Sequence, residues 1–298
     1  MRVFVTGATG FIGSAVVKEL IRAGHEVLGL CRSDDKAPAL AAAGAEIHRG
    51  SIEDLDSLRA GAARSDGVIH LAFNHDFSRF VQNCEDDRRV VTALGSTLAG
   101  SDRPLIVTSG TAMAIATPDH PSTEDGPIMD SSVIPRAASE ETAAAFAAEG
   151  VNVSVMRLPQ VHDTVRQGLV TYLVAIAREK GFLAYIGDGQ QRWPAAHVSD
   201  VARLYRLAFE KAERGAKYHA VAEEGVPLRD IVQTLSRRLE LPARSIAHDE
   251  AEAYFGWLAR FAGHDIPASS EQTRKKLDWR PTGRGMIADL EELQLSGG

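Results

Sequence analysis

Short apolar runs alternate with stretches of helical periodicity through the first half of the chain. Short runs without a polar alternation predict strands that are buried on both faces, and apolar residues three and four apart predict amphipathic helices. Alternation of the two patterns indicates a parallel sheet with helices on both faces. The expected strands are residues 2–5, 26–30, 46–48, 67–71, 105–108 and 151–156. The expected helices between them are residues 15–21, 55–60, 80–99 and 138–148.

After Arg157 the rhythm of the chain changes. One more strand of the sheet is expected at 218–222, and Asp200 is expected to cap the helix that follows it in the sequence. The other expected elements are a glycine-rich loop over 187–193 and helices over 168–180, 202–214, 229–239, 249–261 and 270–277.

These patterns predict two structural units. We expect a doubly wound α/β domain over residues 1–160, to which 195–222 return. We expect residues 161–194 and 223–298 to form a smaller, mostly helical lobe that holds the substrate.

The composition excludes several classes of protein. The chain has 298 residues and a formal net charge of −7, which argues against the clustered basic face that nucleic acids require. No apolar run approaches the ~20 residues that span a bilayer, and the chain starts in a predicted strand rather than a signal peptide. Cys31 and Cys84 lack metal-ligand spacing and suit buried positions in a reducing compartment. We expect a cytoplasmic protein that binds a small-molecule substrate but no metal, nucleic acid or membrane, with a homodimer as the candidate assembly.

A glycine turn follows the first predicted strand and opens the first predicted helix. Glycine at this place lets the backbone approach a pyrophosphate, and the helix N-terminus offers free N–H groups and a positive dipole end. The order of strand, glycine turn and helix is typical of dinucleotide-binding folds. The residues expected to contact the dinucleotide here are Gly7, Thr9, Gly10, Phe11, Ile12 and Gly13.

The spacing Gly7-x-x-Gly10-x-x-Gly13 resembles that of the extended short-chain dehydrogenase/reductase superfamily, which holds sugar epimerases, dehydratases and dihydroflavonol-type reductases. The resemblance implies a Rossmann-type fold, a bound nicotinamide dinucleotide and a substrate lobe built from the end of the chain. It continues at Gly50–Asp54, where it implies that Ser51 and Ile52 hold the adenine edge. It also continues at His70–Phe73, where Leu71, Ala72 and Phe73 would run under the cofactor. Each of these two segments also suits a simple core strand.

The end of the second predicted strand favours NADP over NAD. An acidic side chain there binds the ribose 2′-hydroxyl of NAD, whereas a basic one accepts the 2′-phosphate of NADP. Here the guanidinium of Arg32 can donate two hydrogen bonds to a phosphate, and the Ser33 hydroxyl can add another. Asp34 and Asp35 complicate this interpretation, and we expect them to lie just beyond the cofactor.

The catalytic pattern departs from that of the superfamily. Relatives use a tyrosine and, four residues later, a lysine, with a serine or threonine after the fifth strand. Ser109 and Thr111 match the serine part, although Ser109 also suits a cap of the next segment. No tyrosine or lysine lies between Ser109 and Arg157; the resemblance puts Ser132 at the tyrosine and Arg136 at the lysine. We expect Arg136 to bind the nicotinamide ribose and to keep the site electropositive.

A histidine is the candidate replacement for the missing tyrosine. The stretch Arg157–Asp163 resembles the Arg-Pro-x-x-x-Tyr-Gly-Pro segment of relatives, so Pro159 and Val161 would line the nicotinamide. His162 stands about where that tyrosine falls, and imidazole suits proton transfer near neutrality. The alternative is a histidine that hydrogen-bonds neighbouring backbone.

The substrate site is expected to draw on both units. Trp193 suits an apolar wall or packing between the lobes, and Arg192 stands where sugar-nucleotide enzymes grip a diphosphate. We expect an NADPH-dependent carbonyl reductase of a small, largely uncharged ketone or aldehyde. The alternatives are a sugar-nucleotide epimerase or dehydratase and a non-catalytic NADP sensor, which the missing tyrosine–lysine pair favours. The residues expected to contact the substrate are His75, Met113, His162 and Trp193.

Overall fold

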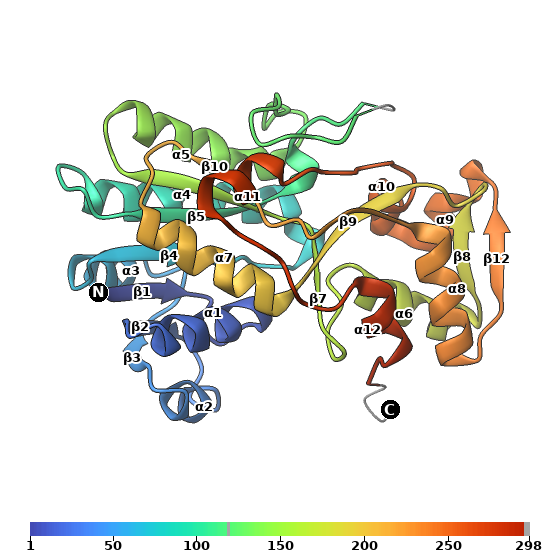
Figure 1. The fold of residues 1–298 in the computed structure, drawn as a ribbon, viewed down its shortest axis with the longest axis horizontal. Helices are drawn as coiled ribbons and strands as arrows, with labels where there is room; N and C mark the ends of the chain where they lie inside the picture. Colours follow the sequence, from blue (N-terminus) through green and yellow to red (C-terminus); the bar gives the residue numbers. More distant parts are fainter. Residues whose placement is uncertain (118–119, 295–298) are drawn as a thin grey trace.

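The computed structural model describes residues 1–117 and 120–294 and is built around a seven-stranded parallel sheet (Figure 1). The strand order is β10-β6-β5-β4-β1-β2-β3. The order reverses at β1, which pairs with β2 on one side and β4 on the other. This is a Rossmann-type doubly wound sheet, as predicted, and ligands of such sheets bind at the carboxyl ends of the strands near the reversal. The strands are β1 (Arg2–Thr6), β2 (Glu26–Cys31), β3 (Glu46–Arg49), β4 (Gly67–His70), β5 (Leu105–Gly110), β6 (Val153–Leu158) and β10 (Lys217–His219).

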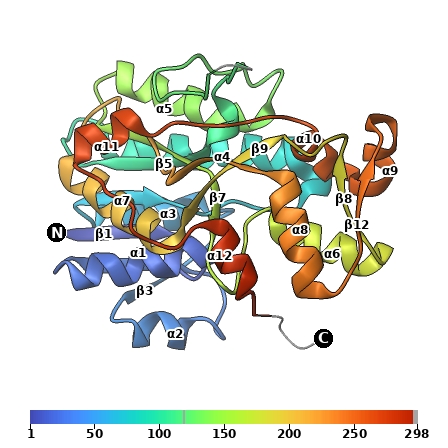
Figure 2. The same cartoon turned by 45° about the vertical axis from the view of Figure 1, so that its right-hand side comes forward.

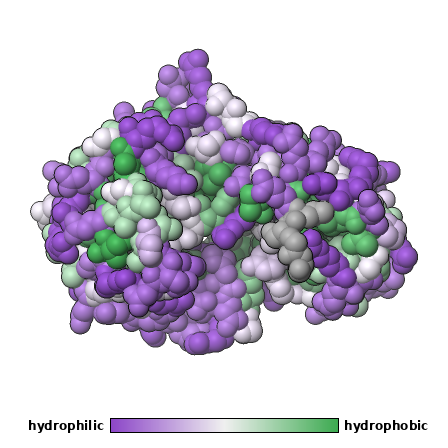
Figure 3. Space-filling model, turned by 90° about the horizontal axis from the view of Figure 1, so that it is seen from below, coloured by the Kyte–Doolittle hydropathy of each residue, from purple (hydrophilic) through white to green (hydrophobic). Residues whose placement is uncertain are grey.

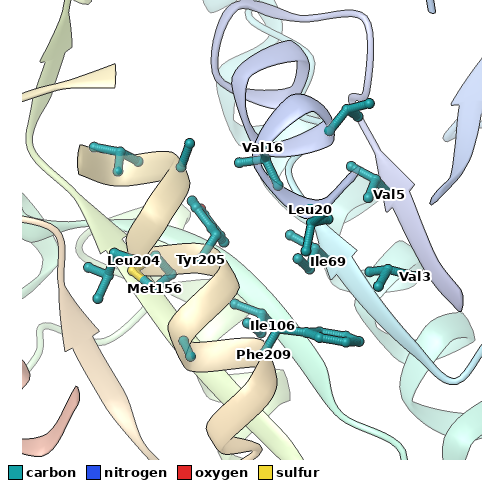
Figure 4. Close-up of a cluster of buried hydrophobic side chains, with 14 of the residues drawn as sticks. Val3, Val5, Val16, Leu20, Ile69, Ile106, Met156, Leu204, Tyr205 and Phe209 are labelled. Carbon is teal, nitrogen blue, oxygen red and sulfur yellow. The ribbon is translucent and has the colours of Figure 1, made fainter. Parts of the chain in front are cut away.

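Helices cover both faces of the sheet. On one face α1 and α7 pack against each other and against the strands, and Figure 4 shows Leu20 of α1 beside Ile69 of β4 and Phe209 of α7 beside Ile106 of β5. Each of these side chains is fully buried, which stabilises the fold by about 1.5–3 kcal/mol apiece. On the other face α3, α4 and α5 form a second hydrophobic cluster with the strands. The helices are α1 (Phe11–Arg22), α2 (Ala37–Ala42), α3 (Leu55–Ala63), α4 (Phe80–Leu98), α5 (Ala138–Ala148), α7 (Val198–Lys211) and α11 (Glu271–Leu277).

A separate hydrophobic cluster forms what we call the small lobe (Figure 2). Its helices pack around a parallel pair of strands, β8 and β12, and Figure 3 shows the lobe as a second mass beside the sheet domain, with an indentation between them. The division of the chain at residue 160 remains a prediction. The elements of the small lobe are α6 (Val170–Lys180), β8 (Leu183–Ile186), α8 (Leu228–Leu239), β12 (Ala243–Ile246), α9 (Ala251–Phe255), α10 (Ala259–Ala262) and α12 (Met286–Glu291).

A three-stranded sheet joins the two units. In it β9 (Arg192–His197) pairs in parallel with β7 (Gln160–His162) and antiparallel with β11 (Glu223–Pro227). The sequence patterns predicted neither β7 nor β11, because strands of three to five residues with mixed polarity lack a clear period.

Two predictions about helix ends were wrong. The expected helix 249–261 is broken, because Gly256 at φ 55° ends α9 and a separate turn, η5 (Gly256–Leu258), begins there. The helix expected to be capped by Asp200 starts earlier, and its cap is His197, whose side chain accepts a hydrogen bond from the N–H of Ser199. Asp200 instead accepts hydrogen bonds from the backbone N–H groups of Thr282 and Gly283, so it fastens the tail of the chain to α7.

Candidate active site

The glycine turn between β1 and α1 has no room for a side chain at Gly7 or Gly13. Gly7 has φ 69°, and a Cβ on it would lie 2.9 Å from the backbone nitrogen of Ala72. A Cβ on Gly13 would lie 2.0 Å from the carbonyl oxygen of Gly7, which no side chain could tolerate. Gly10 caps α1 without any side-chain hydrogen bond, so the helix N-terminus keeps its N–H groups for a ligand. The turn therefore fits the pyrophosphate of a dinucleotide.

Thr6 ties this turn to the segment after β4. Its hydroxyl accepts hydrogen bonds from the N–H groups of Leu71 at 3.1 Å and Ala72 at 3.2 Å and lies 2.7 Å from Nδ1 of His70. Because the Thr6 oxygen accepts both N–H groups, its proton points to Nδ1 of His70, and Nε2 of His70 carries the ring proton. That nitrogen donates to Oδ1 of Asp87 at 2.9 Å. The chain expected to run under the cofactor is thus held by a buried polar network.

Arg136 belongs to the same network. Its guanidinium donates to Oδ2 of Asp87 at 3.0 Å and to the carbonyl oxygen of Thr108 at 2.7 Å, and it lies 4.4 Å from the ring centroid of Phe73. Burial alone would raise the pKa of Asp87, but the charge of Arg136 and the hydrogen bond from His70 outweigh it and hold that pKa at about 2. Arg136 is therefore a fixed cation at the carboxyl ends of the strands. Its contact with a nicotinamide ribose remains a prediction.

Ser109 is the buried hydroxyl in this region that has no partner among the residues that the structure describes. It lies at the end of β5, with 5% of its surface exposed, and its Oγ makes no hydrogen bond there. The following turn, η2 (Thr111–Met113), is capped by Gly110 without a side-chain bond, so Ser109 does not cap it. Since buried hydroxyls are normally paired, this orphan oxygen suits a ligand atom. Thr111 instead donates weakly to the carbonyl oxygen of Leu158 at 3.4 Å, and Met113 is buried.

Two arginines flank the position expected for the 2′-phosphate. Arg32 is exposed, with its Nη1 3.8 Å from a carboxylate oxygen of Glu53. Arg49, the last residue of β3, pairs in register with Cys31 and lies 2.8 Å from Asp34. Arg49 was not predicted as a phosphate contact, although its place at the end of the strand next to β2 was a usable signal for one.

Other predicted cofactor contacts lie near these residues. The Ser33 hydroxyl is hydrogen-bonded to the carboxylate of Asp35, so its role toward a phosphate would require a rearrangement. Ser51 and Ile52 lie in the turn after β3, where Ile52 packs against the hydrophobic cluster of α3 and α4. Pro159 is half-buried at the end of β6, and Val161 is buried in β7.

His162 is not where a proton donor was expected. It is fully buried, and its Nδ1 lies 2.7 Å from Oδ2 of Asp289 on α12, which is also fully buried. Burial lowers the pKa of His162 despite the nearby carboxylates of Asp289 and Glu223. A neutral ring that donates Nδ1–H to Asp289 leaves Nε2 without a proton, and that atom has no partner among the described residues. The structure therefore does not support His162 as the acid or as a substrate contact.

Trp193 does not form a substrate wall. It is fully buried in the small lobe, where its Nε1 donates to the carbonyl oxygen of Phe261 at 3.1 Å. The guanidinium of its neighbour Arg192 donates hydrogen bonds to Asp265 at 3.0, 3.3 and 2.7 Å, so that arginine is paired rather than free for a diphosphate. His75 is exposed and packs edge-on against Phe73 at 5.3 Å.

A model of the NAD dependent epimerase/dehydratase family matches residues 3–222. The chain belongs to this family. The match confirms the resemblance to the extended short-chain dehydrogenase/reductase superfamily.

Several relatives of this epimerase/dehydratase chain are known. An uncharacterized protein of Schizosaccharomyces pombe is 46% identical over 97% of this chain and 98% of its own. An uncharacterized protein of Saccharomyces cerevisiae is 43% identical over 97% of this chain and 98% of its own. Among solved structures, a dTDP-glucose 4,6-dehydratase double mutant of Streptomyces venezuelae with bound NAD has a TM-score of 0.78 and 21% identity, over 98% of this chain and 95% of that one. This last likeness shows the shared fold.

No helix in the described ranges, 1–117 and 120–294, is long and apolar enough to cross a membrane. Within the same residues, no group of three or more His, Cys, Asp or Glu side chains is arranged to hold a metal ion.

Proposed function

We propose that this member of the epimerase/dehydratase family is an NADP(H)-dependent carbonyl reductase that acts on small, largely uncharged ketones or aldehydes. The observation that carries the proposal is the buried hydroxyl of Ser109 at the carboxyl end of β5, which has no hydrogen-bond partner among the described residues. A hydrogen-bond donor held in such a position stabilises the negative charge that develops on a carbonyl oxygen during reduction.

The chain supplies orientation and electrostatics, and the cofactor supplies the redox chemistry. A reduced nicotinamide dinucleotide held at the glycine turn of Gly7, Gly10 and Gly13 would supply the hydride for the carbonyl carbon. Ser109 donates its hydrogen bond to the carbonyl oxygen, and Arg136 keeps positive charge nearby. Ser109 keeps its own proton, because a serine hydroxyl is a far weaker acid than tyrosine. The product oxygen therefore takes its proton from water, which completes the alcohol.

The positions of three arginines separate the candidate functions. Arg32 and Arg49 bracket the ribose end of the predicted cofactor site and favour NADP. Arg192 is held by Asp265, which weakens the case for a sugar-nucleotide epimerase or dehydratase. One relative, 28% identical over 83% of this chain and 69% of its own, is named 2'-dehydrokanamycin reductase of Streptomyces kanamyceticus, a reductase by name.

Oxidation of NADPH against a panel of ketones, aldehydes and nucleotide sugars tests the proposal. We expect turnover with the carbonyl compounds, faster with NADPH than with NADH. Ser109→Ala should lower kcat/KM by about 10²–10³-fold, because it removes the donor to the developing oxyanion, while NADPH affinity stays unchanged. Ser96→Ala, an exposed serine on α4, is the matched control and should behave as wild type.

The other outcomes have definite meanings. NADPH binding without turnover of any carbonyl compound indicates the sensor alternative. Interconversion of a nucleotide sugar without net NADPH consumption indicates the epimerase alternative.

A further inference from the structure

Aromatic rings from both lobes form one continuous chain of contacts. Phe77 stacks on Trp257 with ring centroids 4.0 Å apart and planes 12° apart. Tyr172 meets both rings edge-on, at 5.9 Å from Phe77 and 5.0 Å from Trp257. Phe80 stacks on Phe77 at 5.9 Å and meets Phe73 at 6.4 Å. We call these five residues the aromatic wall.

Local structure fixes the wall on the side of the sheet domain. Phe77 begins a short turn, η1 (Phe77–Arg79), whose cap is Asp76, with the Asp76 carboxylate accepting from the N–H of Ser78 at 3.1 Å. The side-chain amide of Asn83 on α4 donates to the carbonyl oxygen of Asp76 at 2.7 Å. The loop after β4 is thus tied back to α4, and Phe77 is held toward the small lobe.

The small lobe contributes the other two rings. Tyr172 lies in the first turn of α6, and Trp257 lies in η5 directly after the chain reversal at Gly256. These elements belong to the small lobe, whereas Phe73, Phe77 and Phe80 belong to the sheet domain. The wall therefore joins the two lobes on the side of the sheet where its parallel strands end.

One end of the wall lies at the catalytic residues. The ring of Phe73 faces the guanidinium of Arg136, which is bonded to the carbonyl oxygen of Thr108, the residue before Ser109. From there the rings lead away toward Trp257. Ser109 is thus linked to the first ring of the wall through Thr108 and Arg136.

Trp257 is more exposed to solvent than the other two tryptophans. Trp193 and Trp279 are 0% and 1% exposed, whereas Trp257 keeps 37% of its surface exposed although one neighbour is stacked on it. A large apolar side chain that stays exposed beside other aromatic rings is a candidate surface for binding a ligand. Arg192, the arginine that the sequence offered for a diphosphate, is paired with the carboxylate of Asp265.

We propose that the aromatic wall selects carbonyl substrates that carry a flat, apolar ring, namely aryl aldehydes and aryl ketones, which stack on the wall with the carbonyl oxygen at Ser109. This inference rests on the proposed reductase function. Flat rings pack against aromatic side chains with geometry that saturated or polar chains cannot reproduce.

Binding and turnover are measured separately. Because Trp257 is the exposed tryptophan, acrylamide quenching of the protein's fluorescence reports on its access to solvent. With NADP+ present, benzyl alcohol should protect Trp257 from acrylamide, and glycerol at the same concentration should not. In the turnover assay, kcat/KM for benzaldehyde should exceed that for cyclohexanecarbaldehyde and for glyceraldehyde.

Variants of the wall sharpen the test. Trp257→Ala should remove the protected component and lower kcat/KM for benzaldehyde at least about tenfold, with much less effect on acetaldehyde. Trp257→Phe should retain most of the preference, and it guards against a misfolded alanine variant. Val81→Ala is the control, since Val81 is 63% exposed on α4 and is not part of the wall.

The two proposals fail in different ways. Turnover of several carbonyl compounds without protection by benzyl alcohol, and with equal kcat/KM for the three aldehydes, overturns the aromatic wall and leaves the reductase standing. Protection by benzyl alcohol without NADPH oxidation supports ring binding by the wall and overturns the reductase.

Discussion

Asp87 on α4 and Arg136 before α5 form an ion pair of 3.0 Å at the carboxyl ends of the parallel strands. Only 2% of the Asp87 side chain and 13% of the Arg136 side chain are exposed. Asp87 also accepts from His70, and Arg136 also faces Phe73, so this pair connects the end of β4 to the start of the aromatic wall. We infer that Asp87 acts as a positioning residue for both.

Asp87→Asn should destabilise the protein strongly. The substitution keeps the shape of the side chain but leaves the Arg136 charge nearly buried without its counter-ion, which costs about 3–5 kcal/mol in comparable cases. The free energy of unfolding from urea titrations measures the loss. Asp86→Asn is the matched control, because Asp86 is the adjacent, half-exposed residue, paired only with Arg89 and Gln82 on its own helix, and should change that energy by less than about 1 kcal/mol. Equal losses for the two variants would show that the Asp87–Arg136 pair does not stabilise the fold.

Arg32→Ala and Arg49→Ala should each weaken NADPH binding without much effect on NADH. Each change removes a charged hydrogen bond to the 2′-phosphate, which is typically worth about 1–3 kcal/mol. Calorimetric titration with each cofactor measures the difference. Arg59→Ala, on α3 and paired with Asp56, serves as the control. Equal losses for both cofactors would contradict the assignment of NADP.

The fold could be predicted from sequence where burial alone decides the structure. The strands of the large sheet are short apolar runs, since both of their faces are covered, and their predicted bounds differ from those observed by only a few residues. Most strands of the small sheets are short and mixed in polarity, and β8 is apolar but only four residues long. No periodicity distinguishes them from loops, so β7, β8, β11 and β12 were missed.

The same distinction holds for the candidate site. The glycine turn could be predicted from the sequence, because the backbone itself requires glycine at Gly7 and Gly13. His162 was misplaced, because its burial depends on Asp289, which lies 127 residues away on the last helix. Phe77 and Trp257 are also far apart in the sequence, so no local pattern predicts their contact. Contacts between distant segments follow from packing of the whole chain, which a single sequence does not display.

His162→Ala should affect stability rather than chemistry. It leaves the buried carboxylate of Asp289 without its hydrogen-bond donor, which we expect to lower the free energy of unfolding by about 2–3 kcal/mol. His162→Asn supplies an amide N–H in place of Nδ1–H and should recover part of that loss. Below the melting temperature, kcat for both variants should stay within about threefold of wild type. A hundredfold loss of kcat in a folded His162→Ala protein would restore this histidine as the general acid.

His219 should make the protein less stable in mild acid. It is fully buried, donates from Nδ1 to the carbonyl oxygen of Ser269 at 2.8 Å, and accepts at Nε2 from Arg157 at 3.1 Å. Burial lowers its pKa to about 4, and the positive charge of Arg157 acts in the same direction, against the opposing carboxylates of Glu124 and Glu140. In the unfolded chain the histidine has its ordinary pKa near 6.5.

At pH values between these two pKa values, His219 is protonated in the unfolded chain but neutral in the native protein. The free energy of unfolding therefore falls as pH decreases from about 6.5 to about 4, by about 3 kcal/mol from this residue alone, and is unaffected by it above that window. His219→Gln preserves a donor for Ser269 and an acceptor for Arg157 but cannot titrate, so its unfolding energy should depend less on pH. Urea titrations at a series of pH values measure the difference between the two proteins. His264→Gln, at an exposed histidine, should follow wild type; if His219→Gln follows wild type as well, this buried histidine does not set the acid sensitivity.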